Sequence, residues 1–263
     1  MPPFHVRTAT AADRDAYCRL LPELRTGDPA PTPERWATGI APETLVVEAD
    51  GGVIAMSWAR NLGAWAHVVT VMVDPAWQGR GVGKRLMHAV AERLRREGCT
   101  HWYLNVKRDN VPALRLYGSF GLDRPVESTG LMVPWSIVPA IPACLDAPAP
   151  TALDPADDRG FEDHFDLVPG SIAAARGRGE LPIHLGTSAL AVFSPTFPGA
   201  WCFRVAAPDL ARPLLEALRP YAPADVPHVS VMTDDAPAAE LLVAHGAELR
   251  MELYRLSGPI PVA

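Results

Sequence analysis

The chain has 263 residues, 48% of them hydrophobic, and its mean hydropathy is close to zero. This composition is typical of one large globular domain or of two smaller ones. No apolar run approaches the roughly 18 residues that a membrane span requires, and the opening residues MPPFHVRTAT do not combine a charged leader with an apolar core. We therefore expect a cytoplasmic protein that does not bind a membrane.

The net charge of −6 is unevenly distributed along the chain. Residues 1–140 contain 16 Lys and Arg against 14 Asp and Glu, whereas residues 141–263 contain 8 against 16. Nucleic-acid binding relies on clustered Lys and Arg that face phosphates, so an acidic half gives it no support. A small cationic partner fits this charge balance better.

The cysteines are scattered, at Cys18, Cys99, Cys144 and Cys202, and form no C-x-x-C pair. This spacing indicates neither a disulfide framework nor a zinc knuckle. We expect reduced thiols and no metal.

The hydrophobic pattern before residue 75 predicts strands interrupted by short helices. In chain order, these elements are a strand at 5–7, a helix from 10 through 21, a short helix at 33–38, and strands at 44–49, 53–60 and 66–73. Thr10 and Asp13 have the spacing of a capping box, and Asp50-Gly51-Gly52 is typical of a tight hairpin. The last strands should form an antiparallel meander.

A glycine-rich turn follows the strand at 66–73. Gly79, Gly81 and Gly83 open an amphipathic helix over 80–96. The first turn of a helix has N–H groups without intrahelical partners, and glycines let the backbone adopt positive φ and approach an anion closely. The glycine spacing fits neither the Rossmann nor the Walker fingerprint. The sequence therefore predicts a phosphate cradle of another kind.

A strand at 101–106, a helix at 110–118 and a strand at 128–135 complete an α/β layer. Two motifs in this region resemble the GNAT family of acyl-CoA N-acyltransferases. The first is similar to the family's V-x-P followed by [QR]-x-x-G-x-[GA], and reads Val73-Asp74-Pro75 and Gln78-Gly79-Arg80-Gly81-Val82-Gly83. The second is similar to the family's Asn, A-x-x-L-Y and closing Gly plus apolar residue, and comprises Asn110, Ala113, Leu116, Tyr117, Gly121 and Leu122.

The resemblance covers roughly residues 4–135 and implies an α/β (α+β) fold, with a mixed, mostly antiparallel sheet and helices on both faces. It also implies acetyl-CoA as the cofactor. Main-chain groups at the end of the strand would bind the pantetheine arm, the glycine-rich turn would bind the pyrophosphate, and an asparagine would bind the CoA arm. These cofactor-binding candidates are Val71, Met72, Val73, Gln78, Gly79, Arg80, Gly81, Val82, Gly83, Lys84 and Asn110.

Tyr117 matches the tyrosine that protonates the departing thiolate in the family. For the general base, His67 occupies a strand position that carries a catalytic histidine in some arylalkylamine-type members, and an ordinary histidine pKa of about 6.5 suits proton removal at neutral pH. Glu48, Asp50 and a chain of water molecules are the alternatives. Trp36 is a candidate for lining the acceptor pocket, since this region forms one wall of that pocket in the family.

Residues 138–156 are rich in Pro and Ala and are interpreted as a linker. Beyond them the chain repeats the element order seen after residue 66. The repeated elements are a strand at 201–206, a helix at 209–219, a strand at 228–233, a helix at 235–245 and a strand at 248–256. The predicted domains are thus a catalytic GNAT domain at 1–137 and a degenerate GNAT-like domain at 157–263.

The second repeat lacks the features that would bind the cofactor. Ala206-Ala207-Pro208-Asp209 replaces the glycine-rich turn, and Leu242 stands where Tyr117 stands. Pro208 has no N–H to donate, and Asp209 would repel a phosphate. We expect no CoA in this repeat, and leave open whether its rim shapes the acceptor pocket.

These features predict an enzyme that moves acetyl from acetyl-CoA to a primary amine of a small acceptor, by direct attack in a ternary complex. Glu48, Asp163 and Asp166 are candidates for binding a cationic acceptor, such as a polyamine or an aminoglycoside of the kasugamycin kind, which would imply antibiotic resistance. The alternatives are acetylation of an amino acid, a mycothiol precursor or a protein N-terminus, and a non-catalytic CoA sensor. The intact Tyr117 favours the enzyme, and the sequence leaves a homodimer open.

Overall fold

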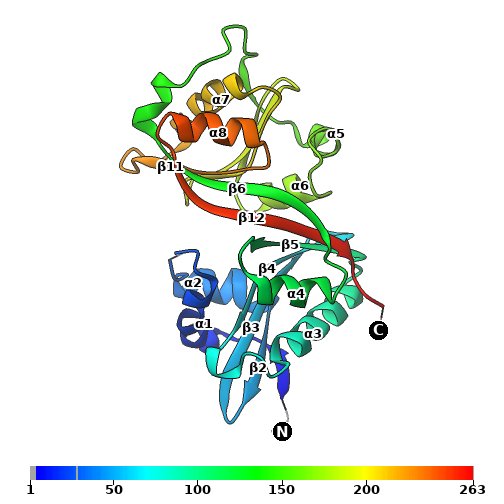
Figure 1. Ribbon diagram of the computed structural model, residues 1–263. Helices are drawn as coiled ribbons and strands as arrows, with labels where there is room; N and C mark the ends of the chain where they lie inside the picture. Colours follow the sequence, from blue (N-terminus) through cyan, green and yellow to red (C-terminus); the bar gives the residue numbers. More distant parts are fainter. Residues whose placement is uncertain (1–3, 28, 263) are drawn as a thin grey trace. The chain divides into compact units, whose positions relative to one another are not determined.

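The computed structural model describes residues 4–27 and 29–262. The chain groups into two compact units (Figure 1). Unit 1 comprises residues 1–105, 111–124 and 256–263, and unit 2 comprises residues 106–110 and 125–255. The units therefore interleave along the sequence, so that the last residues belong to the unit that contains the first.

Unit 1 is built on a mixed sheet with the strand order β1-β2-β3-β4-β5, followed by the end of β12. The strands of the first group are β1 (His5–Thr8), β2 (Thr44–Ala49), β3 (Gly52–Asn61), β4 (Trp65–Val73) and β5 (His101–Lys107). Neighbours from β1 to β4 are antiparallel, and β4 and β5 are parallel. Asp50 and Gly51 join β2 to β3 with φ of 51° and 77°, as a tight type I′ hairpin turn requires.

Helices cover both faces of this sheet, with α1 and α2 on one side and α3 and α4 on the other (Figure 1). Their bounds are α1 (Arg14–Leu20), α2 (Pro33–Arg35, continued by a π-helical turn at Trp36–Ile40), α3 (Val82–Arg96) and α4 (Val111–Gly118). α3 buries Leu86, Val90 and Leu94, whose spacing places them on one helical face. On the opposite side of the sheet, Tyr17 and Trp36 join the core cluster that contains Met72 of β4.

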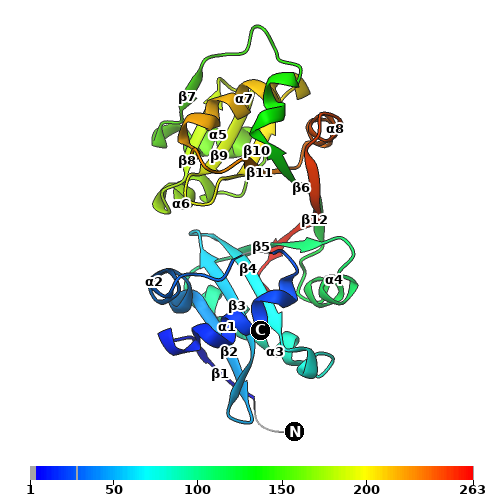
Figure 2. The same cartoon turned by 90° about the vertical axis from the view of Figure 1, so that its left-hand side faces the viewer.

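The strands of unit 2 follow in the order β12-β6-β11-β10-β9-β8-β7 of the 12-stranded sheet. Its strands are β6 (Arg124–Pro134), β7 (Pro150–Ala152), β8 (Leu181–Leu185), β9 (Ala189–Ser194), β10 (Gly199–Val205), β11 (His228–Thr233) and β12 (Glu248–Pro259). β10 and β11 are parallel, and β7 lies at the edge of the sheet (Figure 2). The end of β12, from Leu256, belongs to unit 1.

The helices of unit 2 also lie on both faces of their sheet. They are α5 (Asp158–His164), α6 (Ser171–Gly177), α7 (Ala211–Leu218) and α8 (Ala236–Ala244). Alternate residues of β9 face opposite sides: Ala191 packs in the core with α7 and α8, whereas Leu190 packs with α5 and α6. Unit 2 thus repeats the element order of unit 1.

The predicted fold class is confirmed, and the predicted strand at 44–49 and the strand at 228–233 have the bounds that the structure shows. The helix expected from residue 80 begins at Val82 instead, because the glycine turn extends to Gly81. β8, β9, α5 and α6 were not predicted. None of the helices formed by the described residues combines the length and apolarity needed to cross a bilayer.

Residues 138–156, interpreted as a linker, pack against unit 2. Val138, Ile141 and Leu153 are buried, and Pro150–Ala152 form β7. A Pro- and Ala-rich stretch carries little hydrophobic periodicity, so the sequence did not indicate these contacts. The bounds of the compact units accordingly differ from the predicted domains 1–137 and 157–263.

Candidate functional site

The glycine-rich turn between β4 and α3 has the backbone conformation of an anion cradle. Gly79 and Gly81 have φ of 71° and 79°, and Gly81 is the N-cap of α3. A Cβ built on either glycine would meet no atom within 4 Å, so their role is conformational. The Arg85 N–H donates to the Gly81 carbonyl at 3.0 Å, the first bond of the helix, which leaves the N–H groups before it directed out of the helix end.

Gly83 lies against side chains of α4 and β4, unlike Gly79 and Gly81. A Cβ built there would lie 3.2 Å from Leu116 Cδ2 and 3.7 Å from Val73 Cγ2. The missing side chain therefore allows α3 to approach α4 and β4 closely. Gly83 sets the packing of the helix that carries the cradle.

Side chains from the N-terminal helical region fix the start of the turn. The Asp74 carboxylate accepts a bond from the Ala76 N–H at 3.0 Å, and its other oxygen lies 2.5 Å from Nη1 of Arg19. Gln78 Nε2 donates to the Val73 carbonyl at 3.0 Å and lies 3.4 Å from a carboxylate oxygen of Glu23. Arg19 and Glu23 were missed by the motif reading, since they precede the turn by about 55 positions.

Beside the turn, β4 and β5 are paired over only part of their length. Their register runs from Trp65 with His101 to His67 with Tyr103, although β4 continues to Val73. On its other side β4 stays paired with β3 up to Val73. We call the stretch of β4 beyond these pairs, residues 68–73, together with β5 beside it, the β4–β5 opening; backbone groups of this stretch are not paired with β5 in the register and can bind an amide-containing ligand.

A β-bulge lies directly beyond the last β4–β5 pair. The β3–β4 register shifts from Trp58 with Thr70 to Ala59 with Val68, so Val69 is the extra residue. Bulges increase the local twist of a strand and often occur next to active sites. This bulge marks the point from which β4 extends beyond its pairing with β5.

Tyr117 lies on α4 and is 7% exposed. Burial raises the pKa of its hydroxyl well above the ordinary value, so the group stays protonated at neutral pH. The Tyr117 carbonyl accepts the N–H groups of Phe120 and Leu122 at 2.9 and 3.2 Å, which closes the end of α4. A buried, protonated phenol can act as a proton donor and not as a base.

Among the candidate bases, His67 lies in the last register pair before the opening. Its ring stacks on Tyr103 with centroids 4.4 Å apart and planes 9° apart. Glu48 lies on β2, two strands from β4, where its carboxylate is 2.5 Å from Nη2 of Arg7. Asp50 occupies the hairpin turn after β2. Only the histidine is thus next to the opening among these three.

Trp36 is a core residue, with 1% of its surface exposed. Its Nε1 donates to the carbonyls of Thr10 and Ala11, both at 3.1 Å, and its ring centroid is 4.9 Å from that of Tyr17. The Trp36 indole is therefore part of the buried core on which α1 and α2 pack.

Known proteins similar to this chain show the family to which it belongs. Residues 14–122 match the model of the acetyltransferase (GNAT) family. The N-alpha-acetyltransferase RimI of Mycobacterium tuberculosis is 34% identical over 129 residues, which cover 46% of this chain and 80% of the relative. The chain belongs to the GNAT acetyltransferase family.

Other similarities concern smaller or more divergent stretches. A mycothiol acetyltransferase of Nocardiopsis dassonvillei is 38% identical over 86 residues, 29% of this GNAT chain, which spans about a quarter (26%) of that relative. A tandem GNAT protein from the clavulanic acid biosynthesis pathway superposes with a TM-score of 0.56 at 16% identity, covering 99% of this chain and all (100%) of that one. The whole chain therefore has the tandem GNAT fold.

Unit 2 contains a counterpart of the β4–β5 opening. The parallel β10–β11 register runs only from Gly199 with Ser230 to Ala200 with Val231, and the β9–β10 register shifts at Trp201. In this counterpart the Asp235 carboxylate accepts a bond from the Val205 N–H at 3.1 Å. A side chain of the protein thus satisfies a backbone donor at the end of β10.

Neighbouring charges hold this arrangement in place. Asp234 pairs with the buried Arg204 and lies 3.3 Å from Nη2 of Arg255. Asp235 directly precedes α8, as Asn110 directly precedes α4, and the residues that follow are Ala-Pro-Ala and Val-Pro-Ala, respectively. At the end of β10 a backbone donor is thus already bonded within the chain.

The carboxylates proposed for acceptor binding in the second half are exposed. Asp163, on α5, lies 2.7 Å from Nη2 of Arg159 and has 60% of its side chain exposed. Asp166 follows α5 with φ of 49°, and its carbonyl accepts a bond from Arg255 at 3.5 Å. Both belong to unit 2.

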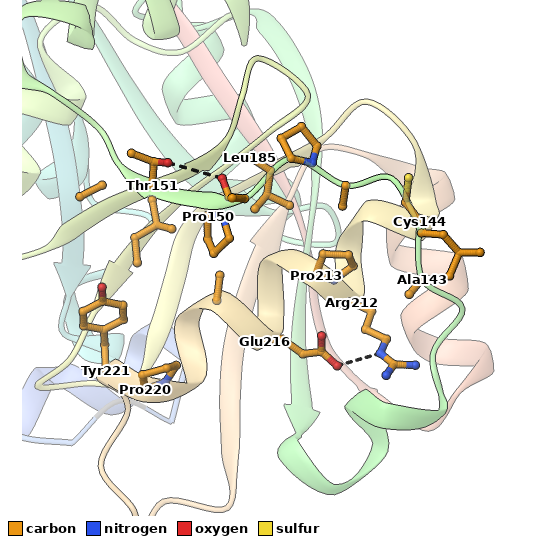
Figure 3. Close-up of a pocket in the computed structure, with 17 residues that line it drawn as sticks. Ala143, Cys144, Pro150, Thr151, Leu185, Arg212, Pro213, Glu216, Pro220 and Tyr221 are labelled. Atoms are coloured by element: carbon orange, nitrogen blue, oxygen red, sulfur yellow. Dashed lines mark hydrogen bonds and ion pairs between the residues drawn. The ribbon is translucent and has the colours of Figure 1, made fainter.

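Unit 2 also contains a cavity of about 610 Å³, between α7 and the segment that leads into β7 (Figure 3). Pro213 and Tyr221 line it on one side and Pro150 and Thr151 on the other. It includes no residue of the predicted site. Within the described ranges, no group of three or more His, Cys, Asp or Glu side chains could hold a metal ion.

Proposed function

We propose that this GNAT chain transfers acetyl from acetyl-CoA to a primary amine of a small, cationic acceptor. The observation that carries the proposal is the turn at Gly79 and Gly81, whose positive φ values direct the N–H groups at the start of α3 outward beside the β4–β5 opening. Acetyl-CoA, when bound, supplies an activated acyl thioester. The residues of the chain bind it, orient it and move protons.

The binding residues follow from this geometry and from the family resemblance. The main chain of residues 71–73 binds the pantetheine arm, residues 78–84 bind the pyrophosphate, and Asn110 binds the CoA arm. Lys84 and Arg80 are exposed at the turn and add positive charge, while Arg80 lies over the Trp77 ring at 5.2 Å. Fixed orientation of the two reactants can contribute about 7–11 kcal/mol in favourable systems.

Two side chains carry the proton transfers in this proposal. His67, directly or through a water molecule, accepts the proton that the acceptor ammonium loses before its nitrogen attacks the acyl carbon. Tyr117 donates its hydroxyl proton to the sulfur as the carbon–sulfur bond breaks. At neutral pH the Tyr117 phenol carries the proton that this role requires, as a phenol of ordinary pKa near 10 also does.

The charge of the second half supports a cationic acceptor. Residues 141–263 contain 8 Lys and Arg against 16 Asp and Glu, and an anionic region raises the encounter rate of an ammonium-bearing molecule. Aminoglycosides of the kasugamycin kind and polyamines are the candidate substrates. The second repeat serves as a degenerate GNAT-like domain that binds no cofactor, which is supported by the bond that Asp235 accepts from the Val205 N–H and by the lack of a glycine-rich turn.

A mycothiol precursor or an amino acid is the second candidate acceptor. It is favoured by the 38% identity to a mycothiol acetyltransferase over 86 residues. The non-catalytic CoA sensor is disfavoured by the presence of Tyr117 on α4.

A thiol-release assay with acetyl-CoA tests the proposal. The panel contains polyamines, aminoglycosides, amino acids, a cysteine-bearing mycothiol precursor and a peptide with an N-terminal alanine. We expect turnover of cationic amines that rises with pH, as the amine loses its proton, and falls with added salt. The double variant Asp163→Asn and Asp166→Asn should raise the acceptor KM and leave the acetyl-CoA Kd unchanged. Turnover of only neutral or anionic acceptors would move the assignment to the second candidate.

A further inference from the structure

The segment Leu256–Val262, called the closing segment, lies about 140 positions after Tyr117 in the sequence and packs within unit 1. Leu256, Gly258 and Ile260 are buried. The Ile260 N–H donates to the carbonyl of Thr100, directly before β5, at 2.9 Å. The closing segment is therefore an integral part of the unit that carries the candidate site.

Gly258 approaches the backbone at the end of α4 more closely than any side chain would permit. A Cβ built on Gly258 would lie 2.0 Å from the carbonyl oxygen of Gly121 and 3.0 Å from its carbon. Cβ atoms in real structures essentially never come within 3.0 Å of another heavy atom, and this neighbour is backbone, which cannot rotate away. The Gly258–Gly121 contact thus fixes where the α4 end can lie.

The backbone around Gly121 is in turn bonded to Tyr117. Gly121 has φ of 74° and donates its N–H to the Gly118 carbonyl at 3.1 Å. The next residue, Leu122, donates its N–H to the Tyr117 carbonyl at 3.2 Å. A displacement of Gly121 would therefore be transmitted to the residue that carries the phenol.

We propose that Gly258 is a positioning residue for the acetyl transfer, which holds the end of α4 so that the Tyr117 hydroxyl is in place to donate its proton. The inference rests on the proposed role of Tyr117 as the acid. Proton transfer requires the two heavy atoms at hydrogen-bond separation, and misplacement by about 1 Å can cost on the order of a hundredfold in rate. The turn at Gly79 and Gly81 precedes α3 and lies outside the end of α4, so we expect this contact to affect Tyr117 more than cofactor binding.

A double-mutant cycle between Gly258→Ala and Tyr117→Phe tests this inference. In the otherwise wild-type chain, Gly258→Ala should lower kcat about tenfold and leave the acetyl-CoA Kd within about twofold. In the Tyr117→Phe background, where no phenol remains to be positioned, the same change should lower kcat less than about twofold. An equal loss in both backgrounds, or wild-type kcat in Gly258→Ala, would overturn the proposal.

Two glycine controls separate positioning from crowding. Gly52→Ala changes an open position of unit 1, where an added Cβ meets nothing within 4 Å. Gly130→Ala changes a crowded strand position of unit 2, 2.7 Å from Met251 Cγ. Both should keep kcat within about twofold of wild type. A loss in Gly130→Ala equal to that in Gly258→Ala would assign the effect to general destabilisation and contradict the proposal.

If Gly258→Ala does not fold, Ile260→Ala takes its place in the cycle, since it loosens the closing segment without adding an atom. The same non-additivity with Tyr117→Phe is then expected, and additivity overturns the proposal. A wild-type chain that binds no CoA and releases no thiol with any acceptor refutes the proposed function itself, which is a different result from an additive cycle in an active enzyme.

Discussion

Gly81 adopts φ of 79° at the N-cap of α3, a conformation that strongly disfavours a β-branched residue. We expect Gly81→Val to abolish measurable CoA binding, because the valine would move the turn out of this conformation and tilt its N–H donors away from the phosphates. Isothermal titration calorimetry with CoA measures the effect. A folded Gly81→Val chain with unchanged affinity would show that the turn is not the cofactor site.

Tyr117→Phe keeps the aromatic ring and removes only the hydroxyl. Turnover should fall about 10²-fold, with acetyl-CoA affinity unchanged, because only the proton donor is lost. Steady-state kinetics and calorimetry on one preparation give both quantities. Wild-type turnover in the Tyr117→Phe variant would show that Tyr117 is a packing residue.

Burial of Tyr117 also makes the stability of the fold depend on pH. Since burial raises the pKa of Tyr117, the stability that this buried phenol provides is fully present below about pH 10 and is lost as pH rises further.

At the level of single residues, the sequence indicated which groups belong to the site better than it indicated what each does. The motif included Gly79, Gly81 and Gly83 together, yet only the first two have positive φ, and Gly83 serves helix packing. The same limitation applies to Trp36, since burial depends on residues distant in the sequence. No local pattern shows which glycine will face a helix and which a ligand.

Arg108 joins the segment between β5 and α4 to the long strands β6 and β12 of unit 2. Its main-chain N–H and its Nε donate to the carbonyls of Glu252 and Leu253 at 3.2 and 3.3 Å, and its guanidinium lies 5.5 Å over the Tyr254 ring. A lysine could not make the Nε bond and the stacking contact together. The residue thereby holds the segment that ends at Asn110.

We expect Arg108→Met to raise the acetyl-CoA Kd roughly fivefold to tenfold, because Asn110 is no longer held, with a smaller change in kcat. Arg108→Lys should be intermediate. Arg250→Met is the matched control on β12, since Arg250 lies 2.8 Å from the exposed Glu248, and should bind like wild type. Equal acetyl-CoA affinities for the two Arg108 variants and for Arg250→Met would contradict the prediction.

Arg7 joins β1, β2 and the turn before α1. Its Nη1 lies 2.8 Å from Asp13 Oδ2, and its Nη2 lies 2.5 Å from Glu48 Oε1. The bond from Arg7 is the main cause that lowers the Asp13 pKa to about 2. A depressed carboxyl pKa stabilises the fold above the ordinary value near 4, and this stability is lost as pH falls toward 2.

The free energy of unfolding should therefore decrease between pH 4 and pH 2 in wild type, and Asp13→Asn should be less stable at pH 6 and less sensitive to acid. Urea denaturation at several pH values measures both effects. Asp15→Asn is the control, because that side chain is 99% exposed. An Asp13→Asn chain with the acid sensitivity of wild type would assign the loss to other carboxylates.

Among the elements, the sequence predicted those with clear periodicity and missed those without it. α3 and the β2–β3 hairpin follow from an apolar helical face and a turn signal, respectively. β9 is buried at every position, so it lacks the alternation that marks a half-exposed strand. α5 is short and contains Gly160, which weakens its helical signal.

On the scale of the whole chain, the sequence repeat predicted two GNAT-like units but not their interleaving. β12 begins in unit 2 and its end belongs to unit 1, while residues 125–134 of β6 belong to unit 2. A strand of alternating polar and apolar residues can pair with different neighbouring strands, so its pattern alone does not show where each part pairs. The partner of a strand is a tertiary property.

The tandem fold raises the question of how many CoA molecules one chain binds, and the two openings indicate that it binds one. The turn of unit 1 contains Gly79 and Gly81, whereas in unit 2 Asp235 accepts the Val205 N–H and Pro208 has no N–H to donate. Asp209, which follows Pro208, would also repel phosphate. We expect calorimetric titration of wild type with CoA to saturate at one equivalent and Gly81→Val to bind none. If unit 2 held a second site, wild type would take up two equivalents of CoA and the Gly81→Val chain would retain one. The variant therefore distinguishes a second unit that binds no CoA from one that binds CoA weakly.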